Sequence, residues 1–365
     1  MADKTGPQKI IAIDLLRAFA ALGVFYYHNH AGSTIAKYTG LSFFRVTDAF
    51  GATFAVPLFF LISGYCIHAS NIKYLKANRS LPLKEYYIRR FLRIYPAYFI
   101  ALFVALAVNY FTLNNYRPTN NDLLIHLFAL QGFTTPYFNT INLVLWTISI
   151  EIAFYIIYPL FYYIRFKYNL NSALAFTFVI SCISIFYYGY GNGVSLPQRF
   201  CVFNLWFAWC CGAFLADKKA FNPGDLKKTV YLYFYLIILI SCICLHYIPN
   251  KLNILSDQFN ILFWTAPMLL ILSRENWLRQ KQNLWLIKIA AAIGLSSYSL
   301  YLLHEPLISL KNFLVHKYFT TSFQLAGVVI GIFIIPVIAW VSYLYVEEPF
   351  IHKKHRVAAK VPIKI

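Results

Sequence analysis

The chain has 365 residues, of which 60% are hydrophobic and 12% are charged, and it carries a formal net charge of +19 at pH 7. Soluble domains usually carry about a quarter charged residues, so this composition excludes an ordinary water-soluble enzyme. The apolar content also argues against a nucleic-acid partner, which a strongly basic soluble chain would suggest.

Apolar stretches follow one another along almost the whole chain. A helix needs about 20 apolar residues to cross a bilayer core roughly 30 Å thick. We therefore predict an all-α, polytopic membrane protein with about ten transmembrane helices. The expected helices cover residues 10–30, 49–70, 91–113, 143–164, 170–189, 199–216, 229–248, 257–273, 286–307 and 323–346. The segment 120–140 is rather apolar but short, so we expect a lumenal or re-entrant piece there.

Lysine and arginine alternate between the two sides of this predicted bundle. With the N-terminus in the cytoplasm, 24 of the 32 Lys and Arg residues fall in inner segments and 7 in outer segments, while Arg17 lies within the first helix. Cytoplasmic loops of membrane proteins collect these residues. We therefore predict that both termini are cytoplasmic, with one membrane domain over residues 1–350 and a basic cytoplasmic tail over residues 351–365.

The seven cysteines lie almost entirely inside the apolar stretches, and none forms a metal-like array with histidines. Small buried hydrophobic side chains are their simplest interpretation, and we predict no metal site. These cysteines are Cys66, Cys182, Cys201, Cys210, Cys211, Cys242 and Cys244.

The first helix carries three ionisable residues, Asp14, Arg17 and His28. Such groups are costly inside a membrane and mark function by default. The eleven steps from Arg17 to His28 come to about 20° beyond three turns and about 16 Å of rise, so both side chains share one face. Asp14 precedes Arg17 by three positions and can pair with it. The alternative is a helix-locking ion pair and an interfacial histidine.

The second and third helices each carry a short motif. The second contains Phe-Phe-Leu-Ile-Ser-Gly, ending at Ser63 and Gly64, small residues that are typical of close helix pairing. The third begins at a basic cluster that contains Arg89, Arg90, Arg93 and Tyr95. Guanidinium groups match phosphate oxygens, so this cluster is a candidate phosphate site. Lipid head-group contact and a topology signal are the alternatives.

Two later helices carry polar residues near their predicted outer ends. The helix at 143–164 includes Trp146, Ser149 and Glu151, and an intramembrane carboxylate needs a partner or a polar cavity.

The helix at 286–307 includes Tyr298 and His304. We expect His304 to lie at the level of His28 and Glu151.

Taken in order, these motifs resemble the acyltransferase-3 family of integral membrane O-acyltransferases. Five blocks along the chain carry the resemblance: Arg17 with His28, Phe59 to Gly64, Arg89 to Pro96, Trp146 to Glu151, and Ser297 to Pro306. Two departures are that Leu15 replaces the family's frequent glycine before Leu16-Arg17, and that only one acid, Glu151, follows the tryptophan block.

The resemblance implies a membrane acyltransferase domain that takes an acyl group, most commonly acetyl, from cytoplasmic acyl-CoA and transfers it to a hydroxyl at the outer face. It also implies that the histidine of the first helix is catalytic and that the arginines serve the donor. The acceptors it suggests are saccharides such as O-antigen or lipopolysaccharide, other surface polysaccharides and peptidoglycan, with a bacterial inner-membrane location.

Joining this implication to the helix geometry predicts a mechanism. Arg17, Arg89, Arg90, Arg93 and Tyr95 bind acyl-CoA, and its pantetheine arm runs along the Arg17–His28 face. His28 acts as general base, oriented by Glu151.

The expected acceptor site comprises His304, Trp146, Ser149 and Tyr298, although His304 can equally be structural. Direct transfer and an acyl-histidine relay both fit. A transporter or flippase and a non-catalytic membrane scaffold are the rival functions, and the oligomeric state is open.

Overall fold

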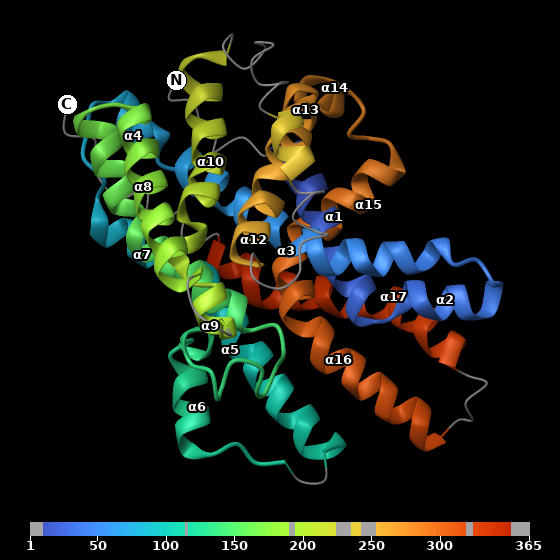
Figure 1. Cartoon of the computed structure of the whole chain (residues 1–365). Coiled ribbons are helices and arrows are strands. Elements are labelled where there is room, and N and C mark those ends of the chain that lie inside the picture. The colour runs from blue at the N-terminus through green and yellow to red at the C-terminus, as the bar shows by residue number, and fades with distance from the viewer. Residues whose placement is uncertain are drawn as a thin grey trace.

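The computed structural model describes residues 10–113, 116–189, 194–223, 235–241, 253–318 and 324–351. Every secondary-structure element within these ranges is a helix (Figure 1). Eight helices in the described part are long and apolar enough to cross a membrane, or nine if one bent pair counts as a single span. The predicted all-α membrane fold is therefore confirmed.

The helices divide into long spans and short connecting pieces. In chain order they are α1 (Ile11–His28), α2 (Ala31–Thr39), α3 (Phe43–Ala69), α4 (Ile72–Lys76), α5 (Leu83–Thr112), α6 (Asn120–Leu127), α7 (Trp146–Lys167), α8 (Leu170–Gly189), α9 (Leu196–Arg199), α10 (Val202–Phe221), α12 (Asn253–Phe263), α13 (Thr265–Ser273), α14 (Glu275–Gln280), α15 (Trp285–Leu295), α16 (Ser297–Tyr318) and α17 (Gln324–Ser342). A π-helical segment, Tyr343–Glu347, continues α17.

The core of the bundle is built around α3, which packs against both α1 and α10. Two glycines allow the α3 and α10 backbones to approach closely. A Cβ atom on Gly64 would overlap the carbonyl oxygen of Trp209, and one on Gly212 would overlap the carbonyl oxygen of Leu61. Small residues serve this purpose widely between membrane helices.

Several helix boundaries differ from the sequence-based ranges. Helix α3 begins six residues before the predicted start at 49, and α5 begins eight residues before the predicted start at 91. The sequence ranges ended where the apolar residues ended, but a backbone can continue its hydrogen-bonded helix into water. The basic cluster of residues 89–93 therefore lies inside α5 rather than in a loop.

The predicted helix 286–307 is instead the bent pair α15 and α16, which meet at Ser296 with an angle of 73° between them. The cause is a cap that comes from far along the chain. Oε1 of Glu347 accepts hydrogen bonds from the backbone N–H of Ser299 (2.9 Å) and from its hydroxyl (2.5 Å). The backbone N–H of Ser299, in the first turn of α16, thus donates to this carboxylate rather than to a carbonyl oxygen of α15.

The predicted helix 257–273 is also divided, into α12 and α13, at Trp264. Pro267 lies in the first turn of α13, and proline cannot donate the i→i−4 hydrogen bond that would join the two helices. Segment 120–140 forms α6, a 3-10 turn and irregular chain rather than a span. Of the predicted helix 229–248 only residues 235–241 are described, and they are helical. The tail after residue 351 lies outside the described residues.

Candidate active site

A cavity of about 330 Å³ lies among α1, α3, α5, α7 and α16. Its lining includes four charged side chains, Arg17, Arg90, Arg93 and Glu151. We call this cavity the arginine pocket. Arg17 of α1 and Arg90 and Arg93 of α5 thus line one space, although they are far apart in the sequence.

Two arginines of α5 are held in the pocket by neighbouring polar and aromatic groups. Nη2 of Arg90 donates to Oγ of Ser70 at 2.7 Å, and its guanidinium lies over the rings of Tyr86 and Tyr155, at 5.4 and 5.5 Å from their centroids.

Arg93 is held by the π-helical segment after α17. Its Nη1 donates to Oε2 of Glu347 at 2.7 Å, and its guanidinium lies 5.6 Å from the ring centroid of Tyr298. A guanidinium carries five N–H donors, so each arginine keeps donors beyond these contacts with which to bind an anion.

Glu151 lies level with Arg17. Oγ of Ser63 donates to Oε1 of Glu151 at 2.6 Å, and Ser63 lies one turn before Cys66, whose sulfur accepts a hydrogen bond from Nη2 of Arg17 at 3.4 Å. His28 is about 16 Å farther along α1. The structure therefore does not bring Glu151 to His28.

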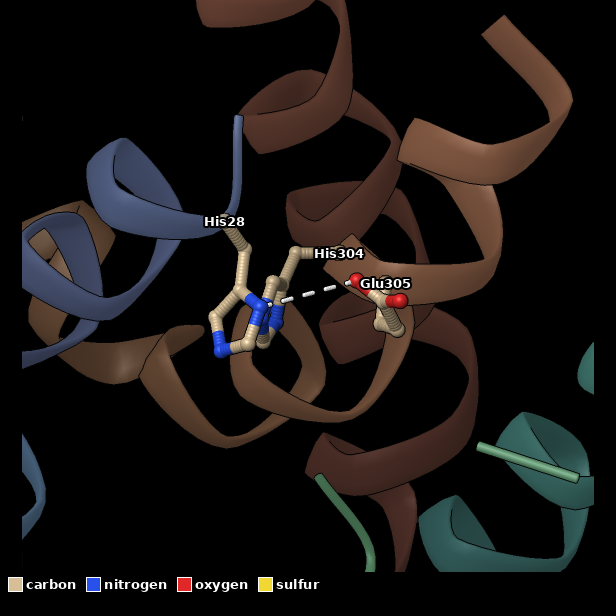
Figure 2. Close-up of side chains that lie close together, drawn as sticks. All are labelled: His28, His304 and Glu305. Atoms are coloured by element: carbon tan, nitrogen blue, oxygen red, sulfur yellow. Dashed lines mark ion pairs between the residues drawn. The ribbon is translucent and has the colours of Figure 1, made fainter. Parts of the chain in front are cut away.

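His28 instead belongs to a second polar group at the other end of α1 (Figure 2). Its Nδ1 lies 3.8 Å from Oε2 of Glu305, and its ring centroid lies 5.1 Å from that of His304. Both partners come from α16. We call His28, His304 and Glu305 the histidine cluster.

The predicted partner of His28 is thus corrected from Glu151 to Glu305. The distance of Glu151 from the predicted helix boundary suggests the level of His28, but α7 contributes this residue at the depth of Ser63. Glu305 follows His304 directly in the Ser297–Pro306 block. This carboxylate beside a candidate site histidine was the sequence signal for Glu305, and it was missed.

Tyr301 connects the two polar groups. It lines the arginine pocket, and its ring packs against that of His304 with centroids 5.7 Å apart. Its hydroxyl accepts a hydrogen bond from Oγ1 of Thr147 at 2.9 Å, which holds the ring. The pocket therefore ends beside the histidine cluster.

Several predicted site residues lie elsewhere. Nη2 of Arg89 donates to the side chain of buried Asn71 at 3.2 Å, and Tyr95 stacks on Phe91 with centroids 4.6 Å apart. Neither is among the residues that line the arginine pocket. Asp14 is buried in α1, where the Gly294 backbone passes close to its carbonyl group.

Two of the predicted acceptor-binding residues, Trp146 and Ser149, also lie outside the pocket and make structural contacts there. Trp146 packs against Phe138 and Phe200, whose ring centroids lie 5.1 and 4.3 Å from its own. Oγ of Ser149 accepts a hydrogen bond from the backbone N–H of Gly132 at 3.0 Å. Tyr298, by contrast, lines the pocket.

A protein-family model and several relatives match this chain. A family model described as an acyltransferase domain matches residues 10–346. The O-acetyltransferase OatA of Staphylococcus aureus is 25% identical over 389 residues, covering 98% of this chain and 60% of the relative. The peptidoglycan O-acetyltransferase OatA of Listeria monocytogenes is 31% identical over 183 residues, covering 46% of this chain and 26% of the relative.

The chain therefore corresponds to less than two thirds of the length of each of these relatives. No solved structure matches it. The family match spans nearly all of the described helices, including those that carry the arginine pocket and the histidine cluster. The chain is a multi-pass membrane protein and belongs to the acyltransferase-3 family.

Proposed function

We propose that this protein is a membrane O-acyltransferase that moves an acetyl-type group from acyl-CoA, bound from the cytoplasm, to a hydroxyl of a saccharide at the outer face. The observation that carries this proposal is the arginine pocket, which gathers Arg17, Arg90 and Arg93 and ends at Tyr301 beside His304. A donor-binding region and a base thus lie at two ends of one route.

The arginine pocket suits the donor. Coenzyme A carries several phosphate charges, and guanidinium groups bind phosphate oxygens in a planar, two-point manner. The α5 arginines lie near the predicted cytoplasmic end, while aromatic and aliphatic side chains such as Phe59, Ile94 and Tyr301 line the rest of the cavity. A thin pantetheine arm can extend through this part toward the histidine cluster.

The histidine cluster suits the chemistry. A neutral His28 imidazole takes the proton from the acceptor hydroxyl as general base. The hydroxyl oxygen then attacks the thioester carbonyl carbon, the C–S bond breaks, and the leaving thiolate receives the proton from the imidazolium. Glu305, 3.8 Å from the ring, favours the imidazolium that forms. This is direct transfer, in which no acyl-enzyme intermediate is needed.

The acceptor that we propose is a cell-envelope saccharide. One relative is named a peptidoglycan O-acetyltransferase, which adds weight to peptidoglycan relative to the O-antigen and lipopolysaccharide acceptors expected from the sequence. Comparing O-acetyl groups on peptidoglycan and on lipopolysaccharide by mass spectrometry, in cells with and without the protein, distinguishes these acceptors.

The activity itself is tested with the purified chain in lipid nanodiscs. Given acetyl-CoA and cell-envelope saccharide, the wild type should release free coenzyme A and form acetylated saccharide in equal amounts. His316→Gln, which changes an exposed histidine of α16, is the control for His28→Gln. A transporter, flippase or scaffold would release no coenzyme A.

The proposal also requires the predicted sidedness. Lys76 and Asn120 are both exposed, and the alternation of Lys and Arg predicts that Lys76 faces the cytoplasm and Asn120 the outside. Cysteines introduced at these two positions should react with a membrane-impermeant thiol reagent from opposite sides, with the unsubstituted chain as the background control. Labelling of both from one side would contradict the donor route.

A further inference from the structure

His304 is a buried histidine with an unused nitrogen. Its side chain is fully buried, and Nδ1 lies 3.2 Å from the backbone carbonyl oxygen of Leu300. A carbonyl oxygen only accepts hydrogen bonds, so Nδ1 carries the proton and Nε2 carries a lone pair. Within the described residues Nε2 has no hydrogen-bond partner. A buried polar atom in this condition is rare and indicates an occupant.

The groups around that lone pair are those of a metal site. One ligand atom from each of His28, His304 and Glu305 lies within 4.8 Å of the others. Two imidazoles and one carboxylate, with a fourth position open, form a common donor set for zinc. The Nδ1–H contact of His304 with a backbone carbonyl is also the contact that usually fixes the ring of a metal-binding histidine.

We propose that the histidine cluster binds one divalent ion of the zinc class. The ion takes the lone pair that His28 needs as general base, so metal binding and the proposed proton transfer exclude one another. Metal–ligand distances near 2.0–2.1 Å place the ligand atoms of a tetrahedral ion about 3.3 Å apart, so side-chain rotations close the site from its present spacing. The side chains of His28 and Glu305 are 18% and 23% exposed, whereas His304 is buried. The ion therefore enters from the side of His28 and Glu305.

This site was not predicted from the sequence, where only the cysteines were considered as metal ligands. His28 and His304 are 276 positions apart, and only the packing of α1 against α16 joins them. The donor set also defines the class of ion. Magnesium and calcium prefer oxygen ligands, whereas imidazole suits zinc and its neighbours among the transition metals.

The test measures metal binding to the purified full chain, after treatment with a chelator, by competition with a zinc-binding dye. All samples carry His352→Ala and His355→Ala, because these two tail histidines are a separate pair that can bind zinc. We expect one Zn²⁺ per chain, with no competition from excess Mg²⁺. X-ray absorption should show imidazole nitrogens and carboxylate oxygen at about 2.0–2.2 Å.

Substitutions assign the ligands. His304→Asn and Glu305→Gln should each weaken zinc binding by at least about ten- to a hundredfold, whereas the exposed His30→Ala and His316→Ala should leave it unchanged. Glu305→Gln keeps the shape of a partly exposed side chain, so it remains informative even if His304→Asn fails to fold.

The proposal is overturned if the tail-substituted chain binds no zinc, or if zinc affinity is the same in Glu305→Gln as in the unsubstituted cluster. Because the readout is binding and not acyl transfer, the outcome is independent of the proposed enzymatic function.

Discussion

Among the described residues, two of the groups in which a histidine meets a carboxylate join different helices, and they are built differently. At the ends of α3, α7 and α10, His68 is fully buried with both nitrogens in contact, one with the hydroxyl of Tyr158 at 3.1 Å and one with Asp217 at 3.0 Å. Arg165 adds two further hydrogen bonds to Asp217, at 2.8 and 3.2 Å. We call these four residues the His68 cluster.

The histidine cluster at His28 also combines histidine with a carboxylate, but fewer of its hydrogen-bonding atoms have partners. Its histidine and carboxylate are 3.8 Å apart and partly exposed, and Nε2 of His304 has no partner among the described residues. A saturated buried group locks helices together and has no atom left for a ligand. An unsaturated group at the end of a cavity keeps lone pairs for a substrate or an ion. The presence of a histidine beside a carboxylate does not by itself separate the two cases, whereas counting the hydrogen-bond sites in use does.

The largest expected effect comes from the same substitution made in both clusters. His28→Gln keeps hydrogen bonding but removes the base, so acyl transfer per inserted molecule should fall by about 10²–10⁴-fold while insertion stays normal. His68→Gln should instead reduce the amount of folded protein and leave the rate per folded molecule much closer to wild type. The measurement is acetylated acceptor divided by inserted protein. Full activity in His28→Gln would return α1 to a packing or transport role.

The second prediction concerns stability. Asp217→Ala leaves Arg165 and His68 without their shared carboxylate, and removing one partner of a buried ion pair costs about 3–5 kcal/mol. Thermal unfolding of the purified protein should show a markedly lower midpoint. Arg199 and Asp257 form another such pair, at 2.6 Å, and offer a control. An equal drop in the unfolding midpoint of Asp257→Ala would mean that the His68 cluster stabilises the fold no more than this pair does.

The third prediction distinguishes between the arginines of the basic cluster of α5, all of which were predicted from the sequence to bind acyl-CoA. Arg90 and Arg93 line the arginine pocket, and Arg89 does not. A charge-assisted hydrogen bond contributes roughly 1.5–3 kcal/mol, so Arg90→Ala and Arg93→Ala should raise the KM for acyl-CoA about ten- to a hundredfold. Arg89→Ala should act on folding through Asn71. Equal KM effects in all three would contradict the division.

Much of the fold could be read from the sequence because crossing a bilayer imposes length and hydropathy on each helix separately. The shared face of Arg17 and His28 was likewise a matter of one helix, and both residues do belong to polar groups of the structure. Local information was insufficient wherever two helices had to be placed at the same depth. Glu151 was assigned to His28 from its distance to a helix boundary, yet hydrogen bonding places it with Ser63 and near Arg17.

Caps and clusters formed by distant residues were not predictable for the same reason. The bend at Ser296 depends on Glu347, which bonds Ser299 from 48 positions away. The His68 cluster joins residues that are 149 positions apart. In each case the sequence shows a polar residue in an apolar segment, but the partner that decides between a structural and a functional role is set by helix packing.

The smallest expected effect on rate, and the sharpest comparison, comes from Glu305→Gln. At 3.8 Å and partly exposed, this carboxylate interacts with His28 without a direct hydrogen bond, and such pairs contribute about 0.2–1 kcal/mol. Acyl transfer should therefore fall by no more than about fivefold. Zinc binding should fall much further, since a metal ligand is lost. Acyl transfer measured with a chelator present and zinc binding measured on the same preparation separate the two roles of the cluster. A hundredfold loss of rate would place Glu305 in the chemistry itself, whereas parallel small losses would remove it from the metal site.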